Sequence, residues 1–112
     1  MPARARTPRR LLTPAALHIL LTLADGDQHG YAIRAAVEER TGGELALGPG
    51  TLYEALHRMV EAGWIRATSD DGARKKTYTL TAEGRAELDD ELRRLDEIVS
   101  YARNHALFPD RS

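Results

Sequence analysis

The stretch LGPGTLYEALHRMVEAGWI, residues 47–65, decides how the rest of the chain is interpreted. A proline lies just inside one end and a glycine just past the other. Pro49 sets a helical φ where no N–H is needed, and Gly63 accepts the left-handed conformation that ends many helices. We therefore expect a helix over about residues 49–62.

This helix has two unlike faces. At 100° per residue, the apolar side chains share one face: Leu52, Leu56, Met59 and Val60. The opposite face is polar: Thr51, Glu54, Arg58 and Glu61. The pattern is typical both of an ordinary amphipathic surface helix and of a helix that meets DNA, so the flanking sequence must decide between them.

A buried helix is expected near the start of the chain. Thr13 followed by Pro14 is typical of a helix N-terminus, and residues 15–24 are apolar nearly all round. The side chains expected to face the core are Leu17, Leu20, Leu21 and Ala24. Ile19 and Leu23 lie on another side, which suggests contact with a second surface.

A second helix should begin at His29-Gly30-Tyr31 and continue to about residue 41, where two glycines stop it. The alternation of Leu45 and Leu47 predicts a short strand over residues 44–47. Three helices in close succession, the last two joined by a short connection, form a helix-turn-helix.

The residues after the third helix predict a β-hairpin. Strands are expected over residues 64–68 and 76–80, with a turn at 69–72. Arg74, Lys75 and Lys76 lie near its tip. A basic cluster on a hairpin is often merely solvated, but beside a recognition helix it would grip the DNA backbone or minor groove, as the wing of a winged helix.

A final helix is expected over about residues 82–106, capped by Thr81 and followed by Pro109. At about 1.5 Å per residue it is roughly 37 Å long, more than this small domain can cover. Its heptad seam consists of Leu88, Leu92, Leu95, Val99, Ala102 and Ala106, widened by Ile98 and Tyr101. We favour dimerisation over a helix folded back on its own domain.

Composition limits the remaining choices. The chain has 112 residues, a net charge of −1 and no cysteine, so it holds one core and neither disulfides nor thiolate zinc sites. The longest apolar run is too short to span a bilayer, and no secretion signal is recognised, so we expect a soluble, cytoplasmic protein without a membrane partner.

Charge is unevenly distributed along the chain. Residues 1–10 carry four arginines and no acid, and residues 81–112 carry eight acids against five bases, a net of −3. The first ten residues should form a disordered basic arm, either a solvated tail or a contact to DNA backbone or minor groove. The organisation expected is an arm (1–10), a winged helix-turn-helix (11–80), a dimerisation helix (81–108) and a tail (109–112).

Four ordered segments together resemble the PadR family of bacterial transcriptional regulators. They are Leu12-Thr13-Pro14, His29-Gly30-Tyr31-Ala32-Ile33, Pro49-Gly50-Thr51-Leu52-Tyr53-Glu54-Ala55-Leu56 and Tyr78-Thr79-Leu80-Thr81-Ala82-Glu83-Gly84. The single C-terminal helix is similar to the short-chain branch of that family. The resemblance implies a mainly α fold with a small β-hairpin, namely a winged helix-turn-helix followed by a long dimerisation helix.

The resemblance also implies a function, that of a homodimeric repressor on a palindromic operator in double-stranded DNA. Two positions depart from the family pattern: Gly48 replaces a usual Ser or Asn cap, and Glu54 replaces a common proline. A carboxylate at Glu54 can accept from cytosine N4 but is repelled by phosphate. Some short-branch relatives bind flat aromatic drugs through a tryptophan on the last helix. The only tryptophan here, Trp64, is expected in the core.

Residues can now be assigned to expected roles. The DNA-binding set is Gly50, Thr51, Tyr53, Glu54, His57, Arg58, Arg74, Lys75 and Lys76, in which Tyr53 either packs at the domain edge or reaches a phosphate. The dimerisation set is Leu88, Leu92, Leu95, Ile98, Val99, Tyr101 and Ala102. Tyr101 and Phe108 are the only aromatic residues near a pocket for a small hydrophobic effector, whose existence stays open.

Other classes of function find little support. The four histidines lie on four different elements without metal-ligand spacing, and no glycine-rich phosphate loop is present, so no catalytic residue, metal or cofactor is expected. His29 is expected to be a helix-start or core-edge residue. The alternative that stays open is a winged-helix adaptor that binds another protein through the third helix and the hairpin, since Glu54 and Glu61 lie on the outward face.

Overall fold

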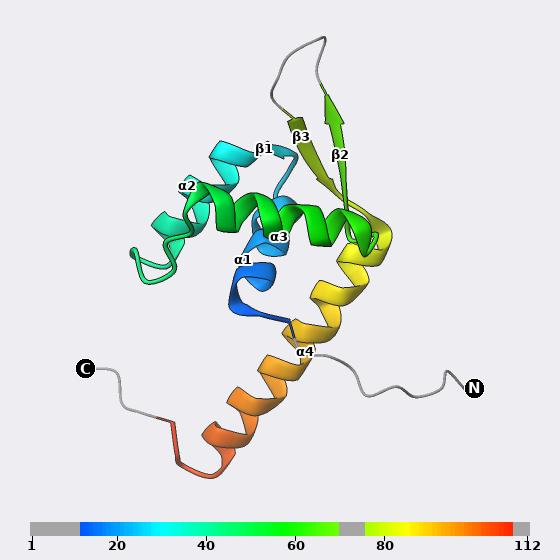
Figure 1. Ribbon diagram of the computed structural model, residues 1–112. Coiled ribbons are helices and arrows are strands. Elements are labelled where there is room, and N and C mark those ends of the chain that lie inside the picture. Colours follow the sequence, from blue (N-terminus) through cyan, green and yellow to red (C-terminus); the bar gives the residue numbers. More distant parts are fainter. Residues whose placement is uncertain (1–11, 70–75, 109–112) are drawn as a thin grey trace.

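The computed structural model describes residues 12–69 and 76–108, and Figure 1 shows their arrangement. The elements follow the order α1 (Pro14–Ala24), β1 (Gln28–His29), α2 (Gly30–Arg40), α3 (Pro49–Glu61), β2 (Ile65–Ser69), β3 (Lys76–Leu80) and α4 (Ala82–Asn104). The antiparallel hairpin β2–β3 rises beside one end of α3, and α4 leads away from the body on the opposite side (Figure 1). The fold is therefore the expected winged helix with a long C-terminal helix.

The helix starts follow local chemistry. The Thr13 hydroxyl accepts the Ala16 N–H at 3.0 Å at the start of α1, and the Thr81 hydroxyl accepts the Gly84 N–H at 3.0 Å at the start of α4. α3 begins at Pro49 after Gly48, which offers no side-chain cap. Gly63 has φ +84° and turns the chain out of α3 into β2.

The core lies where α1, α2 and α3 meet the sheet and the first turns of α4. Its fully buried side chains are Ile19, Leu20, Ile33, Val37, Leu52, Leu56, Ile65 and Leu88. The expectation that Ile19 and Leu23 meet a second surface was wrong, since they are 0% and 3% exposed inside the domain's own core. Of the other residues expected inward, Leu17 and Leu21 are only half-buried, and Ala24 is exposed.

The sheet has one strand more than the sequence predicted. β3 is central in the order β1-β3-β2, and β1 adds two residues to it through the pairs Gln28–Tyr78 and His29–Thr77. So short a strand has no alternation of its own, and only its partner on β3 defines it. It brings the start of α2 against the wing.

The strand predicted over residues 44–47 does not form. Gly42 and Gly43, at φ +62° and +86°, turn the chain sharply after α2, and the Leu45 N–H donates to the Thr41 hydroxyl at 3.1 Å. Leu47 is buried, but its carbonyl accepts from the Arg34 guanidinium at 3.4 Å instead of joining the sheet. The alternation of leucines here anchors a loop to the core.

Candidate nucleic-acid interface

The outward face of α3 brings together six of the predicted DNA-binding residues. Its buried side is Leu52, Ala55, Leu56 and Met59. Its exposed side carries the predicted residues Gly50, Thr51, Tyr53, Glu54, His57 and Arg58. Because one side is fixed in the core, the other is presented on a rigid helix, which suits the reading of a groove.

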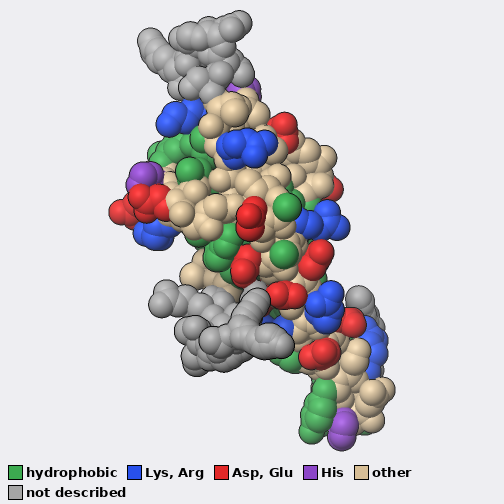
Figure 2. Space-filling model, turned by 90° about the vertical axis from the view of Figure 1, so that its right-hand side faces the viewer, with side chains coloured by type: hydrophobic (Ala, Val, Ile, Leu, Met, Phe, Trp, Pro, Cys, Tyr) green, Lys and Arg blue, Asp and Glu red, His purple; other side chains and the backbone are tan. Residues whose placement is uncertain are grey.

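The charges on this face are mixed. His57 Nε2 lies 3.4 Å from a carboxylate oxygen of Glu61, and both side chains are largely exposed. Glu54 is also exposed. Arg58 is the only arginine or lysine on α3. On the side of the molecule formed by β2, the end of α3 and α4, Figure 2 likewise shows acidic and basic side chains interspersed.

The wing contributes one described cation of the predicted cluster. Lys76 is exposed at the start of β3, whereas Arg74 and Lys75 lie outside the described residues. Lys76 and Tyr78 are two residues apart on one strand and therefore share a face of the sheet. Arg66 on β2, which pairs with Thr79, is exposed on the other face; sequence analysis did not identify it.

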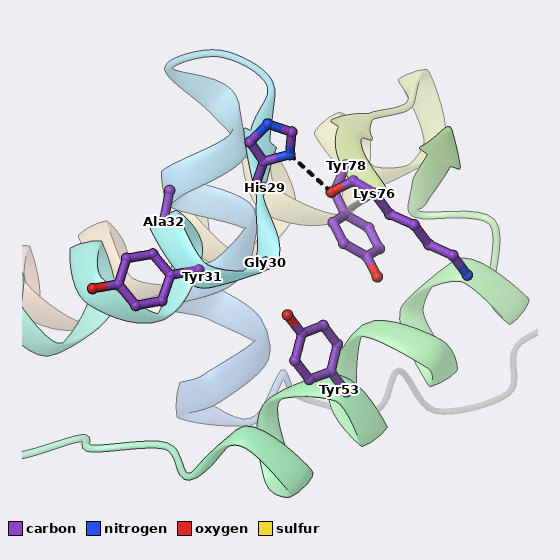
Figure 3. Close-up of a pocket in the computed structure, with 7 residues that line it drawn as sticks. All are labelled: His29, Gly30, Tyr31, Ala32, Tyr53, Lys76 and Tyr78. Carbon is purple, nitrogen blue, oxygen red and sulfur yellow. Dashed lines mark hydrogen bonds between the residues drawn. The ribbon is translucent and has the colours of Figure 1, made fainter. Parts of the chain in front are cut away.

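A cavity of about 530 Å³ lies where α2, α3 and the wing meet (Figure 3). We call it the wing–helix pocket, and it is lined by His29, Gly30, Tyr31, Ala32, Tyr53, Lys76 and Tyr78. The Tyr53 hydroxyl enters from α3 and the Tyr78 hydroxyl from β3, into the same space, whereas the Tyr31 hydroxyl points away (Figure 3). The pocket thus lies between the two elements of the predicted interface, α3 and the wing, and the start of α2, which was not predicted to belong to it.

Close packing positions Tyr53 at this pocket. A Cβ built on Gly30 would lie 2.6 Å from the Tyr53 hydroxyl oxygen, so a larger residue at the start of α2 would make the Tyr53 ring shift from its observed position. Tyr53 itself is 48% exposed. Of the two roles left open by the sequence, packing at the domain edge is therefore observed, and the hydroxyl is still accessible to a ligand.

Tyr78 is the buried polar group of the pocket. The residue is 6% exposed, and no described residue forms a hydrogen bond with its hydroxyl. Burial, and secondarily the neighbouring Tyr53 hydroxyl, raise the pKa of Tyr78 above its ordinary value. The group therefore keeps its proton near neutral pH and can donate.

His29 connects the start of α2 to the wing. Its Nδ1 lies 3.2 Å from the Lys76 carbonyl oxygen and 3.4 Å from the Thr77 hydroxyl (Figure 3). A carbonyl oxygen only accepts, so Nδ1 carries the proton of this bond. His29 is thus a core-edge residue as expected. The wing–helix pocket that His29 lines was not predicted from the sequence, because only the β1–β3 pairing brings His29 and Lys76 together.

The second predicted surface is the seam of α4. Leu88 was wrongly included in it: at 2% exposure it packs into the domain's own core. Glu91 is the last buried residue of α4, and the later turns of the helix lead away from the body (Figure 1). The exposed apolar residues of the predicted seam are Leu92, Ile98, Val99 and Tyr101, whereas Leu95 and Ala102 are half-buried. The apolar surface available to a partner therefore begins at Leu92, the next residue of the seam after Leu88.

The described part of the chain contains no group of three or more His, Asp or Glu side chains that could hold a metal ion. None of its helices is both long and apolar enough to cross a membrane.

Comparison with known proteins gives one family. A model described as the transcriptional regulator PadR-like family matches residues 19–90. A transcriptional regulator of Mycobacterium tuberculosis is 34% identical over 85 residues, which cover 74% of this chain and 77% of that protein. A protein of transposon TN4556 of Streptomyces fradiae is 43% identical over 77 residues, but this chain spans only 21% of its length.

Solved structures share the fold. A PadR family transcription regulator of Clostridium difficile superposes with a TM-score of 0.71 at 28% identity, covering 84% of this chain and 99% of that one. Bacillus subtilis PadR, solved in complex with operator DNA, gives a TM-score of 0.61 at 31% identity, covering 69% of this chain and 45% of that one.

Proposed function

Since this chain belongs to the PadR-like family of transcriptional regulators, we propose that it binds double-stranded DNA as a homodimer and represses transcription from a palindromic operator. In this proposal α3 is the recognition helix, β2–β3 is the wing, and α4 is the dimerisation helix. The relative solved with operator DNA, Bacillus subtilis PadR, supports the first part of the proposal.

The observation that carries the proposal is the position of α3. Its polar side is exposed along the whole helix and lies next to Lys76 and the wing, while its apolar side is fixed in the core. Thr51 and Arg58 are the side chains that we expect to reach base edges, Arg58 through two hydrogen bonds to guanine. Glu54 would select cytosine through its N4 amino group at a cost in phosphate repulsion.

The exposed apolar seam of α4 supports the dimer in this proposal. Val99 and Ile98 are 36% and 53% exposed on a helix that extends past its own domain. Burying a fully exposed Val or Ile side chain contributes about 1.5–3 kcal/mol, and burying the exposed part of these side chains contributes a share of that. A seam of several such residues therefore supports a second copy of the helix alongside. Two copies would place their recognition helices about 34 Å apart, one turn of duplex.

The proposal includes no small effector. Tyr101 stacks on His105 with ring centroids 4.0 Å apart, and the Arg103 guanidinium lies 4.4 Å from the centre of the Phe108 ring. Tyr101 on α4 and Phe108 just after it, the two aromatic residues near a possible effector pocket, therefore already contact neighbouring side chains.

A salt titration tests the wing. The duplex is first obtained by selection from a random DNA pool with the full-length protein, and its affinity is then measured at a series of salt concentrations. Lys75→Ala with Lys76→Ala should weaken binding to all sequences and lower the slope of log K against log salt by about 0.9 for each phosphate that the variant no longer neutralises. An unchanged slope would contradict the wing assignment.

The same selection separates repressor from adaptor. A protein that uses α3 only for protein contacts should enrich no duplex, and its affinity for DNA should not change when Arg58 is replaced. For the proposed function, Arg58→Ala should lower the affinity for the selected duplex by roughly ten- to hundredfold and leave binding to unrelated DNA nearly unchanged.

A further inference from the structure

We propose that the wing–helix pocket seats one phosphodiester group of the bound DNA, which fixes the register of α3 in the groove. Its donors are the first backbone amides of α2, the hydroxyls of Tyr53 and Tyr78, and the Lys76 ammonium. The inference rests on the proposed function, which it refines by assigning a single phosphate contact to a defined pocket.

The N-terminus of α2 supplies the first donors. The first four N–H groups of a helix have no intrahelical partner, and the N-cap residue of α2, His29, makes no side-chain hydrogen bond to them. The first turn of α2 also contains no acidic residue. Gly30, Tyr31 and Ala32 line the pocket, so the positive end of this eleven-residue helix is directed to it.

Tyr78 is the independent sign of a ligand. The ring of Tyr78 is buried, whereas its hydroxyl oxygen is accessible from the cavity, because no buried side-chain oxygen or nitrogen of the described residues lacks a hydrogen-bond partner. A hydroxyl in this position can donate to a ligand in the cavity. Tyr78 is 6% exposed, has no hydrogen-bond partner among the described residues, and directs its hydroxyl into the cavity (Figure 3). An anion oxygen in the pocket would accept this hydrogen bond.

The remaining side chains favour an anion. The lining residues include no Asp or Glu, and Lys76 is the only Lys or Arg among them. The Tyr53 hydroxyl enters from α3 and lies beside Gly30, where the absence of a Cβ leaves room for it. Tyrosine hydroxyls, lysine and helix N-termini are the groups that proteins commonly use on DNA phosphates.

The place of the pocket selects the DNA backbone over a free anion. It lies between the outward side of α3 and the wing, the two elements that would hold the duplex, and Tyr53 belongs to both the pocket and the α3 surface. A helix inserted in the major groove is bordered by backbone phosphates on either side. A phosphate seated here would therefore set how deeply and at what angle α3 enters.

The test is a scan of single neutral phosphates. In the selected duplex, each phosphodiester in turn is replaced by a methylphosphonate, and binding is measured for the wild type, Tyr78→Phe and Lys76→Gln. Tyr31→Phe is the matched control, because it removes a pocket-lining hydroxyl that points away (Figure 3). Melting temperature is recorded for each variant, and Tyr78→Phe should melt at or above the wild type since its hydroxyl has no internal partner to lose.

In each half-site we expect one phosphate at which the methylphosphonate lowers the DNA affinity of the wild type and of Tyr31→Phe roughly tenfold. The same replacement should lower the affinity of Tyr78→Phe and of Lys76→Gln clearly less. If no position shows this coupling while the wild type still binds the duplex, the pocket proposal is overturned and the proposed function stands. If selection with the wild type enriches no duplex and the protein binds none, both the pocket proposal and the proposed function are overturned. Should Tyr78→Phe fail to fold, the exposed Lys76→Gln variant decides the outcome alone.

Discussion

Gly84 shows how one residue joins the hairpin to the long helix. The Thr81 N–H and hydroxyl donate to the carbonyls of Trp64 and Gly63 at 3.1 and 2.6 Å, and the same hydroxyl accepts the Gly84 N–H. A Cβ on Gly84 would clash with the Trp64 carbonyl oxygen. The close approach of α4 to the base of the wing therefore requires glycine at this position.

We expect Gly84→Ala to lower the free energy of unfolding by about 1–3 kcal/mol, because the added methyl meets backbone that cannot move aside. Urea unfolding measures this effect. The control is Gly50→Ala, since Gly50 is also in the first turn of a helix but has open space around it. Gly50→Ala should be neutral or slightly stabilising; a Gly84→Ala protein as stable as that control would contradict the packing argument.

His18 is the residue through which pH should act on stability. The Arg40 guanidinium donates to the Thr22 hydroxyl at 2.9 Å and lies 3.2 Å from His18 Nδ1. A guanidinium has no acceptor, so Nδ1 accepts and the ring is neutral in the fold. Burial first, and then the Arg40 charge, lower the pKa of His18 from its ordinary value of 6.5.

Since the unfolded chain binds this proton below about pH 6.5 and the folded chain does not, the stability from His18 is complete above that pH and is lost as pH falls below it. We expect the urea midpoint to fall from about pH 7 to about pH 5 more steeply in the wild type than in His18→Gln, whose side-chain oxygen can still accept from Arg40. Equal pH dependence in the two proteins would rule out this assignment.

Among the elements, the helices were the most predictable from sequence. Thr13 with Pro14, Pro49 with Gly63, and Thr81 marked helix starts and stops that the structure has at nearly the same residues. The failures were the strand over residues 44–47, where loop hydrogen bonds replaced sheet pairing, and β1, which exists only by pairing with β3. Local signals define helices, whereas strands depend on partners far along the chain.

The outer part of α4 permits a test by neighbouring substitutions. Val99 lies in the apolar seam, and Ser100 is exposed on another side of the same turn. Val99→Asp should place a charge in the dimer interface and give monomers, while Ser100→Asp should leave the dimer intact. Sedimentation equilibrium gives the mass of each. A dimeric Val99→Asp protein would show that the partner binds elsewhere.

At the scale of the whole molecule, the sequence predicted the surfaces but not how they meet. The polar face of α3 and the apolar seam of α4 follow from periodicity alone. The wing–helix pocket does not, because Tyr78 looked like an ordinary strand residue and Gly30 like part of a helix start. Likewise, the burial of Leu88 depends on how many turns of α4 pack against the domain, and no local sequence pattern indicates that number.

The low net charge is a property of the whole molecule that bears on its affinity for DNA. A net charge of −1 and the acids on α3 and α4 imply that few cations meet the duplex, so affinity must come from correctly placed contacts and not from a basic surface. Specific binding by both subunits together, with recognition helices one duplex turn apart, is therefore the central claim.

The most direct test is a hydroxyl-radical footprint of the full-length protein on the DNA upstream of its own gene. We expect two protected segments per site, on one side of the duplex, with centres about 10–10.5 base pairs apart and related by a two-fold axis. The Val99→Asp variant should lose both segments together at protein concentrations that protect them in the wild type. Uniform cleavage, or a single unpaired segment that Val99→Asp retains, would contradict the account.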